Sequence, residues 1–382
     1  MTSDQISDET INALLAARIA AGDFPSAVYL VAERGRIRFS GALGDAVREP
    51  EHHAATVETI YDLASLTKPL VTGLLSARLV ERGELELDRA VAAYLPEFAR
   101  APQTAHITVR HLLTHTSGFP AWRPLRILTG DRRERVLDII AANDLEYATG
   151  SRVVYSDLGF ITLGLLLERI TGAALDESAQ TEIFRPLKLE RTFFKPERAF
   201  LTGVAACELG GNAYERGMCE MGGLADSAGT ATAGAWREEL IWGEVHDGNA
   251  YFLGGAAGHA GLFSTARETL RLAEQFIATR TQLLAPETCA LFRTNMTEGL
   301  NEARSFAWQL AATKDSTAGG ALPPDSFGHT GFTGTSCWID AARERVFILL
   351  TNRTHTRALP FVNINGVRRQ FHTLAVAALE RA

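Results

Sequence analysis

The sequence predicts an α/β protein of the α+β type, in which both ends of the chain supply strands to one antiparallel sheet. Strand-like runs occur near the N-terminus, over 27–41, and again near the C-terminus, over 306–352. Between them the apolar residues recur mainly at helical spacing. Strands at both ends with helices between them indicate a sheet flanked by helices, with a mainly helical domain inserted between its two halves.

The first elements are a helix and a hairpin. Apolar residues at helical spacing predict an amphipathic helix over 6–21, which ends at Gly22. The runs 27–33 and 36–41 are typical of strands, and Arg34-Gly35 joins them in a tight turn.

The later elements are also bounded by caps, glycines or turns. They are helices over 108–113, 158–171, 266–279 and 363–381, the third opened by a capping box at Thr265, and strands over 306–312, 335–339 and 346–352. Two glycine-rich stretches, 221–235 and 243–262, exceed ordinary connections, and loops of that length are often functional. We therefore expect a discontinuous sheet domain (1–70 and 260–382), a helical domain (71–259) and an active site between them.

Composition and charge narrow the class of partner. The net charge of −7 argues against nucleic acid and anionic membranes, and the scattered arginines are interpreted as codon bias. The four cysteines show no metal-like spacing. Neither a signal peptide nor a membrane span is predicted, so we expect a cytoplasmic protein that acts on a small molecule.

One stretch carries a nucleophile and a base at helical spacing. Ser65 precedes an apolar stripe formed by Leu66, Leu70 and Leu74, so it should open a helix and place Lys68 one turn away on the same face. Lysine can activate a serine hydroxyl if burial and the helix N-terminus lower its pKa. The same N-terminus leaves backbone N–H groups free to hold an oxyanion.

Three further stretches complete the pattern: Tyr155-Ser156-Asp157 before an apolar helix, His329-Thr330-Gly331 opening a strand, and the run Leu112-Leu113-Thr114-His115-Thr116-Ser117-Gly118. Ser-x-x-Lys, then Tyr-Ser-x, then His-Thr-Gly resembles the penicillin-recognising serine hydrolases. That family includes class C β-lactamases, D-alanyl-D-alanine carboxypeptidases and family VIII carboxylesterases. The resemblance extends over nearly the whole chain and implies a β-lactamase/transpeptidase-like fold.

The resemblance also implies a role for each motif. Ser65 would be the nucleophile, Lys68 its base, and Tyr155 a proton shuttle to the leaving group and later from water. The backbone N–H groups of Ser65 and Phe332 would form the oxyanion hole. His329, Thr330 and Gly331 would line the substrate site, where Gly331 would let the substrate approach the backbone closely.

Two positions depart from the β-lactamase pattern. His329 stands where β-lactamases usually carry lysine, which weakens the case for carboxylate-bearing substrates. Asp157 stands in the substrate-binding region where many relatives have asparagine, and an ionised Asp cannot donate to a substrate carbonyl. If Asp157 faced Lys68 it would raise the lysine's pKa, so either Asp157 turns away or Tyr155 carries more of the base role.

The other histidines divide between structure and site. His111 and His115 have i, i+4 spacing but lack a zinc-like carboxylate neighbour, and the family resemblance implies that they are structural. No metal or organic cofactor is expected, because Ser65, Lys68 and Tyr155 would supply the nucleophile and the proton transfer. His259, in the loop 243–262, is a candidate substrate-binding residue, with structural hydrogen bonding to the loop as the alternative. The chain has no Gly-x-Ser-x-Gly, which disfavours an α/β-hydrolase.

The function predicted is a serine hydrolase that acts through an acyl-enzyme on small esters or amides. A carboxylesterase-like activity with weak β-lactam hydrolysis is the first choice. A β-lactamase or a D-amino-acid peptidase is the alternative within the enzyme class. An acylated sensor or binding protein without turnover is the alternative outside it, which a burst without steady turnover would reveal.

Overall fold

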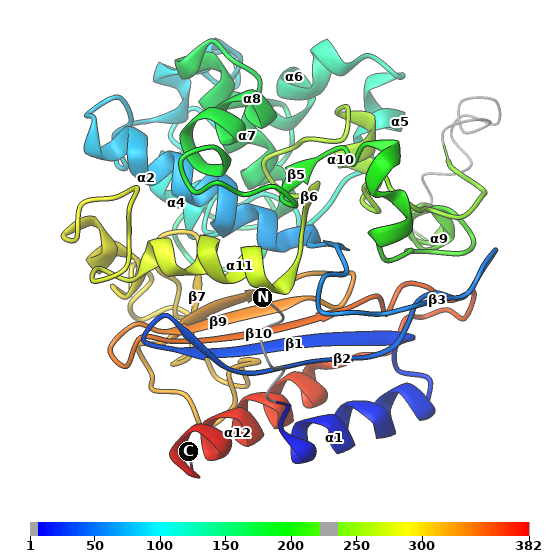
Figure 1. Ribbon diagram of the computed structural model, residues 1–382. Coiled ribbons are helices and arrows are strands. Elements are labelled where there is room, and N and C mark those ends of the chain that lie inside the picture. The colour runs from blue at the N-terminus through cyan, green and yellow to red at the C-terminus, as the bar shows by residue number, and fades with distance from the viewer. Residues whose placement is uncertain (1–6, 222–235, 382) are drawn as a thin grey trace.

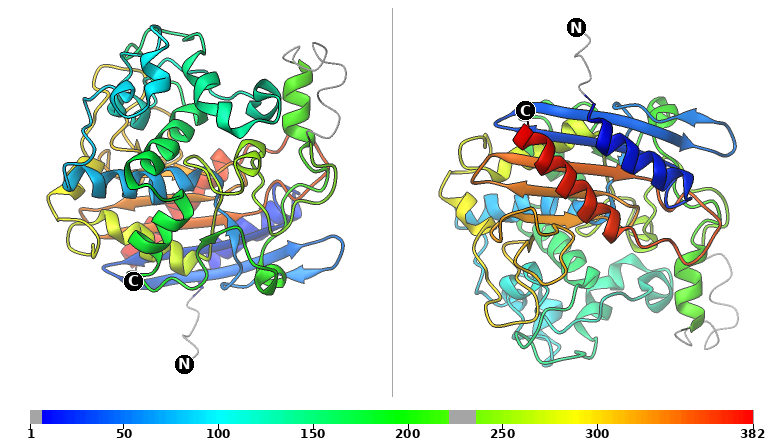
Figure 2. Two further views of the ribbon diagram at one scale, coloured as in Figure 1. Left: turned by 90° about the horizontal axis from the view of Figure 1, so that it is seen from above. Right: turned by 90° about the horizontal axis from the view of Figure 1, so that it is seen from below.

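The computed structural model describes residues 7–221 and 236–381. Within them, one antiparallel sheet has seven strands in the order β3-β2-β1-β10-β9-β8-β7. Helices α1 and α12 lie on one face, while α11 and the mainly helical part lie on the other (Figure 1). Seen from below, α1 and α12 lie side by side across the sheet (Figure 2). The predicted fold class is therefore confirmed.

The strands come from both ends of the chain, as predicted. They are β1 Ser26–Glu33, β2 Arg36–Val47, β3 His53–Ala54, β7 Gln309–Leu310, β8 Phe327–Thr330, β9 Ser336–Asp340 and β10 Arg345–Thr351. A second, three-stranded sheet lies beside the nucleophile turn and consists of β4 Tyr61–Asp62, β6 Leu262–Ser264 and β5 Phe193–Phe194. The domain boundaries near residues 70 and 260 stay a prediction.

The helices are mostly short. They are α1 Glu9–Ala20, α2 Leu74–Glu81, α3 Pro96–Ala99, α4 Val109–Leu113, α5 Leu125–Thr129, α6 Val136–Ala141, α7 Asp157–Thr171, α8 Leu175–Ala179, α9 Ala213–Met221, α10 Gly248–Phe252, α11 Ala266–Ala273 and α12 Asn365–Arg381. In the described ranges no single helix has the length and hydropathy of a membrane span. One helix pair, Asp157–Thr171 with Leu175–Phe184, reaches that length and hydropathy when its two members are taken together, although they are bent by 74°.

The central strand explains why both layers of helices are needed. In β1 the side chains of Val28 and Leu30 join the core beneath the helical part, while those of Tyr29 and Val31 join the core under α1 and α12. Successive side chains of a strand point to opposite faces, so a strand that is apolar throughout must be covered on both sides.

Three predicted elements differ from the structure. The strand predicted over 306–312 shrinks to Gln309–Leu310, because Ala307 adopts a left-handed φ of 65° that interrupts the extended backbone. The helix predicted over 266–279 ends at Ala273, and the Glu268 carboxylate accepts backbone N–H groups of residues 190 and 191 instead of closing the capping box. The second N-terminal strand continues to Val47, where it pairs with β3. The glycine-rich stretch predicted over 221–235 lies outside the described residues except for Met221.

Candidate active site

The predicted nucleophile lies on a tight turn at the edge of the helical part. Ser65 sits in a 3-10 turn over Ala64–Leu66, which a π-turn over Lys68–Gly73 connects to α2. Ala64 has a left-handed φ of 47°, and its N–H donates to the carboxylate of buried Asp62 at 2.8 Å. A non-glycine residue keeps this left-handed backbone conformation only where surrounding contacts hold it, so the turn at Ala64 is fixed by its neighbours.

The structure brings the three predicted catalytic side chains together. The Lys68 Nζ donates to the Ser65 Oγ at 3.0 Å, and the Tyr155 hydroxyl donates to the same oxygen at 2.7 Å. Lys68 is fully buried. One hydroxyl thus meets both an amine and a phenol, although Tyr155 lies ninety residues further along the chain.

Asp157 faces Lys68. Its Oδ1 lies 2.7 Å from the Lys68 Nζ, and the His259 carbonyl oxygen accepts a hydrogen bond from the same Nζ at 3.0 Å. Burial acts to lower the pKa of Lys68, but the contact with the Asp157 carboxylate outweighs burial, and the pKa of Lys68 is raised above its ordinary value. The lowered pKa that a lone lysine base would need is therefore absent, and the raised pKa is the one expected for an Asp157 that faces Lys68. At neutral pH Lys68 rests as an ammonium.

Tyr155 is held in place by His115. The Val154 N–H donates to the His115 carbonyl at 2.9 Å, and the Ser156 N–H donates to the His115 Nδ1 at 3.0 Å. The two rings pack with centroids 4.7 Å apart. Burial lowers the pKa of His115 well below 6.5, so this ring is neutral and its Nδ1 can accept. Burial also raises the pKa of Tyr155 to about 12, so the phenol is a proton donor at neutral pH.

The predicted oxyanion hole is assembled by two threonines that the sequence reasoning missed. The Thr333 hydroxyl donates to the Asp62 carbonyl at 2.7 Å, and the Thr335 hydroxyl donates to the Leu63 carbonyl at 2.9 Å. These bonds tie the turn after β8 to the nucleophile turn. Among the described residues, the N–H groups of Ser65 and Phe332 have no acceptor, which leaves them available to a substrate oxygen.

Gly331 and His329 differ from expectation in how they are placed. A Cβ on Gly331 would lie 2.0 Å from the Thr335 Oγ1 and 2.5 Å from the Leu63 carbonyl oxygen, so the glycine is needed for contact within the protein. His329 and Thr330 close strand β8 instead of opening a strand. Burial and the Lys68 charge lower the pKa of His329 well below 6.5, so it is neutral at pH 7.

Positive charge near His329 comes instead from two arginines. Arg368 is buried and donates to the carbonyls of Gly331 and Thr335, each at 2.9 Å, while its Nε has no partner. Arg353 donates to the Phe332 carbonyl at 2.6 Å. Burial and the neighbouring Arg353 lower the pKa of Arg368 to about 9.

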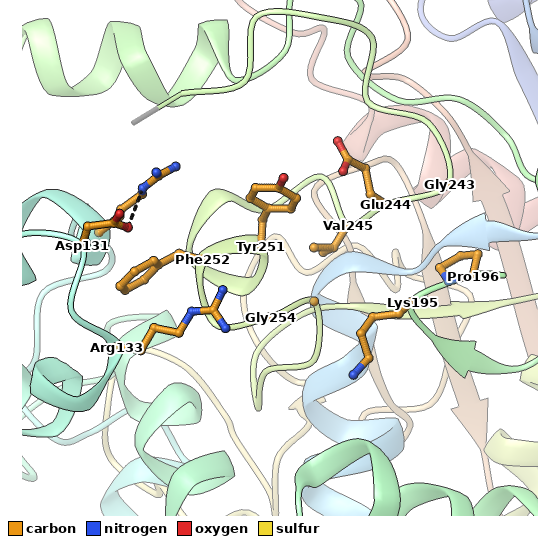
Figure 3. Close-up of a pocket in the computed structure, with 12 residues that line it drawn as sticks. Asp131, Arg133, Lys195, Pro196, Gly243, Glu244, Val245, Tyr251, Phe252 and Gly254 are labelled. Atoms are coloured by element: carbon orange, nitrogen blue, oxygen red, sulfur yellow. Dashed lines mark hydrogen bonds and ion pairs between the residues drawn. The ribbon is translucent and has the colours of Figure 1, made fainter. Parts of the chain in front are cut away.

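These residues line a cavity of about 370 Å³ beside the nucleophile. It contains Ser65, Tyr155, Arg304, Gln309, Asp315, Thr317, His329, Thr330, Gly331, Phe332, Arg353, Asn365 and Arg368. A larger cavity of about 530 Å³ lies among Asp131, Arg133, Lys195 and Tyr251 (Figure 3), but Ser65 is not among its lining residues. We therefore place the candidate active site in the smaller cavity.

His259 contacts Lys68 through its backbone and not through its ring. Its carbonyl accepts the Lys68 hydrogen bond, while its buried ring pairs through Nε2 with the Asp247 Oδ1 at 2.8 Å. The structure therefore gives His259 a place beneath Lys68 and not in the substrate cavity. His111 accepts the Thr108 N–H at the start of α4. In the part of the chain that the structure describes, no group of three His, Cys, Asp or Glu residues could hold a metal ion.

The fold and the site can be compared with known proteins. Among solved structures, EstCE1, described as "a hydrolase with promiscuous acyltransferase activity", has a TM-score of 0.70 and 24% identity, with 95% of this chain and 97% of that chain covered. A class C β-lactamase from Rhodobacter sphaeroides has a TM-score of 0.71 and 18% identity, with 98% and 100% covered. These similarities show the fold.

Sequence comparisons are more specific. A curated "Putative D-alanyl-D-alanine carboxypeptidase" from Escherichia coli (strain K12) is 31% identical over 360 residues, which cover 87% of this chain and 79% of that protein. A family model described as Beta-lactamase matches residues 11–366. With nearly the whole sequence accounted for by that model, the chain belongs to the β-lactamase family.

Proposed function

We propose that the protein is a serine hydrolase that forms an acyl-enzyme on Ser65 from small esters or amides. The observation that carries this proposal is the convergence of the Lys68 Nζ and the Tyr155 hydroxyl on the Ser65 Oγ. A hydroxyl becomes a nucleophile when a neighbouring group takes its proton. The free N–H groups of Ser65 and Phe332 would stabilise the negative oxygen of the tetrahedral intermediate. These residues supply every role, so the proposal includes no cofactor.

A carboxylesterase-like activity fits best the electrostatics at the two positions that depart from the β-lactamase pattern, His329 and Asp157. A β-lactam brings a carboxylate that favours a fixed cation at His329, but His329 is neutral at pH 7. It also brings an acylamide carbonyl that favours a donor at Asp157, but the Asp157 carboxylate faces Lys68. A simple ester has neither group and loses nothing at either position, so weak β-lactam hydrolysis would accompany stronger ester hydrolysis.

A substrate panel tests this proposal. p-Nitrophenyl esters of several chain lengths, nitrocefin and a D-Ala-D-Ala peptide are each given to the wild type and to Ser65→Ala. We expect ester hydrolysis that Ser65→Ala abolishes, and a single fluorophosphonate adduct on Ser65 by intact mass. Activity in Ser65→Ala, or an adduct elsewhere, would contradict the proposal. A burst without steady turnover would instead support the sensor.

A D-amino-acid peptidase is the second candidate, favoured by Arg353 and Arg368. Neither has a carboxylate partner among the described residues, although both line the cavity beside Ser65. The terminal carboxylate of a D-Ala-D-Ala peptide would supply that partner, and the E. coli relative carries a carboxypeptidase description.

One arginine variant distinguishes the esterase candidate from the peptidase candidate. A charge-assisted hydrogen bond contributes about 1.5–3 kcal/mol, or about 10- to 150-fold in rate. If the peptide is the substrate, Arg353→Gln should lower kcat/KM for the peptide by that factor more than it lowers kcat/KM for p-nitrophenyl butyrate, since any loss of support for Phe332 affects both substrates. Arg357→Gln, which removes an exposed arginine paired with Glu49, is the matched control. Equal effects of both variants on the peptide would remove this candidate.

A further inference from the structure

The Lys68 Nζ contacts three oxygens and, as an ammonium, has no free lone pair in the resting site. The Ser65 Oγ lies at 3.0 Å, the His259 carbonyl oxygen at 3.0 Å and the Asp157 Oδ1 at 2.7 Å. An ammonium group has three N–H bonds and no lone pair. Lys68 donates hydrogen bonds to Ser65 and His259 and forms an ion pair with Asp157. As an ammonium, Lys68 therefore cannot accept the proton of Ser65.

For Lys68 to act as a base, its Nζ must first release a proton to one of these three neighbours. A neutral serine hydroxyl and a peptide carbonyl are far weaker proton acceptors than a carboxylate. Asp157 also makes the shortest of the three contacts and lies on the first residue of α7, outside the turn that carries Ser65. The chemistry of the three neighbours selects Asp157.

We propose that Asp157 is a catalytic residue that takes a proton from Lys68 while Lys68 takes the proton of Ser65. This inference rests on the proposed acyl-enzyme function and deepens it. It gives Asp157 a different role from the substrate contact that its sequence position suggests. It also resolves the choice between an Asp157 that turns away and a Tyr155 that replaces Lys68, since Asp157 makes Lys68 usable.

The proton transfers balance as follows. One Lys68 N–H bond breaks and an O–H bond forms on Asp157, which neutralises both groups. The Ser65 proton then moves to the lone pair on Nζ as the Oγ electron pair bonds to the substrate carbonyl carbon. The leaving group departs with the phenolic proton of Tyr155. Lys68 returns a proton to the Tyr155 oxygen, and Asp157 returns its proton to Lys68, which restores the resting charges.

The other groups around Lys68 do not offer this path. Titratable or charged groups near it are Tyr155 from the loop before α7, His115 after α4, His329 from β8, Arg304 before β7, and Asp247 with His259 from the loop around α10. Burial lowers the pKa values of the rings at 115 and 329 well below 6.5, so both are weak proton acceptors, and Asp247 is already paired with His259. In the described part of the chain, Asp157 is the carboxylate in contact with Nζ.

The pH dependence of Asp157→Asn tests the proposal, with kcat/KM for p-nitrophenyl butyrate as readout. In a relay the reactive form carries a carboxylate, so activity falls only where a carboxylate is protonated. If Lys68 acts as a base without Asp157, activity falls wherever its amine becomes an ammonium. With reference pKa values, an amine is protonated several pH units above the pH at which a carboxylate is protonated. We expect Asp157→Asn to move the acidic limb of the pH profile of kcat/KM to higher pH. At pH 7 this variant should have kcat/KM lower by about 100-fold or more. Asp138→Asn, at an exposed ion pair, is the control.

Two other outcomes would overturn the relay. If Asp157 only raises the lysine's pKa as a counter-ion, Asp157→Asn moves the limb to lower pH and the rate at pH 7 rises. If Asp157 only binds the substrate, Asp157→Asn raises KM and leaves the acidic limb of the pH profile at its wild-type position. Asp157→Glu should restore the wild-type limb, and thermal melting verifies that each variant is folded. Activity in Ser65→Ala would instead discredit the proposed function itself.

Lysine labelling gives a readout independent of activity. The chain has four lysines, and Lys188, Lys195 and Lys314 are exposed whereas Lys68 is buried. With ε-¹³C-lysine, the resonance that Lys68→Arg removes should stay in its ammonium position at neutral pH in the wild type. It should titrate at lower pH in Asp157→Asn, because the carboxylate that stabilises the ammonium is gone. A neutral Lys68 at pH 7 in the wild type would refute the relay.

Discussion

Gly331→Ala should disable the oxyanion hole without removing any side chain that reacts. The new Cβ would lie 2.5 Å from the Leu63 carbonyl oxygen and 2.0 Å from the Thr335 Oγ1, which itself donates to that carbonyl at 2.9 Å. Ordinary contacts need more than 3.4 Å. The turn that carries the Phe332 N–H must therefore retreat from Ser65 by about 1 Å.

The size of the effect follows from that displacement. A misplacement of about 1 Å can cost about 100-fold in rate, and loss of one oxyanion donor costs about 10²–10³ in kcat. Overpacking lowers the free energy of unfolding by about 1–3 kcal/mol. We expect a folded variant with kcat for p-nitrophenyl butyrate reduced about 100-fold or more, measured with a thermal melt of the same sample.

A second glycine provides the control. Gly217 lies in α9, and a Cβ there would meet nothing within 4 Å. Gly217→Ala should therefore keep kcat and leave stability unchanged or slightly higher. If Gly331→Ala retains kcat within threefold of the wild type, the turn does not set the oxyanion geometry and the argument from these contacts fails.

Three further predictions concern His115, His372 and metals. His115→Asn keeps an acceptor for the Ser156 N–H and tolerates the φ of 58°, so its kcat should stay within about tenfold of the wild type. His115→Leu lacks that acceptor and should lower kcat by more than about tenfold, with KM nearly unchanged. Burial lowers the pKa of His372 from 6.5 to about 4, so the unfolded chain binds this proton first as the pH falls. At about 1.4 kcal/mol per pH unit, up to about 3 kcal/mol of stability present above pH 6.5 is lost by pH 4, and urea unfolding of His372→Asn should show a shallower pH dependence. Activity should survive dialysis against EDTA, and a loss that zinc restores would return attention to His111 and His115.

The residues that meet at Ser65 could be predicted because each belongs to a short motif with local geometry. Lys68 lies one helical turn from Ser65, so the spacing alone aligned the two side chains. The strands near both termini could be predicted because β1 and β10 carry nearly continuous apolar runs. Tyr155 was placed by the order of motifs and not by spacing, since only the folded chain brings its hydroxyl to Ser65.

The electrostatics of the site could not be predicted, because they depend on how distant elements dock. Asp157 reaches Lys68 only through the placement of α7 against the turn after Ser65, and the sequence left its direction open. Arg353 follows β10 and Arg368 lies on α12, so no local pattern links either of them to His329. Ala307 shortened β7 through a backbone conformation that apolar alternation does not reveal.

The distribution of charge in the site separates groups that move protons from groups that hold positions. His115 and His329 flank Tyr155 and are both kept neutral by burial, so neither competes for the Ser65 proton. Tyr155 carries its proton in the resting site because burial raises its pKa to about 12, and it can then deliver that proton to the leaving group. Among the described residues, Asp157 is the carboxylate in contact with the Lys68 Nζ, so the proposed proton transfer runs between these two groups. The aspartate that departs from the β-lactamase pattern therefore changes the source of basicity from a lone amine to an ion pair, with the Ser65 and Tyr155 contacts retained.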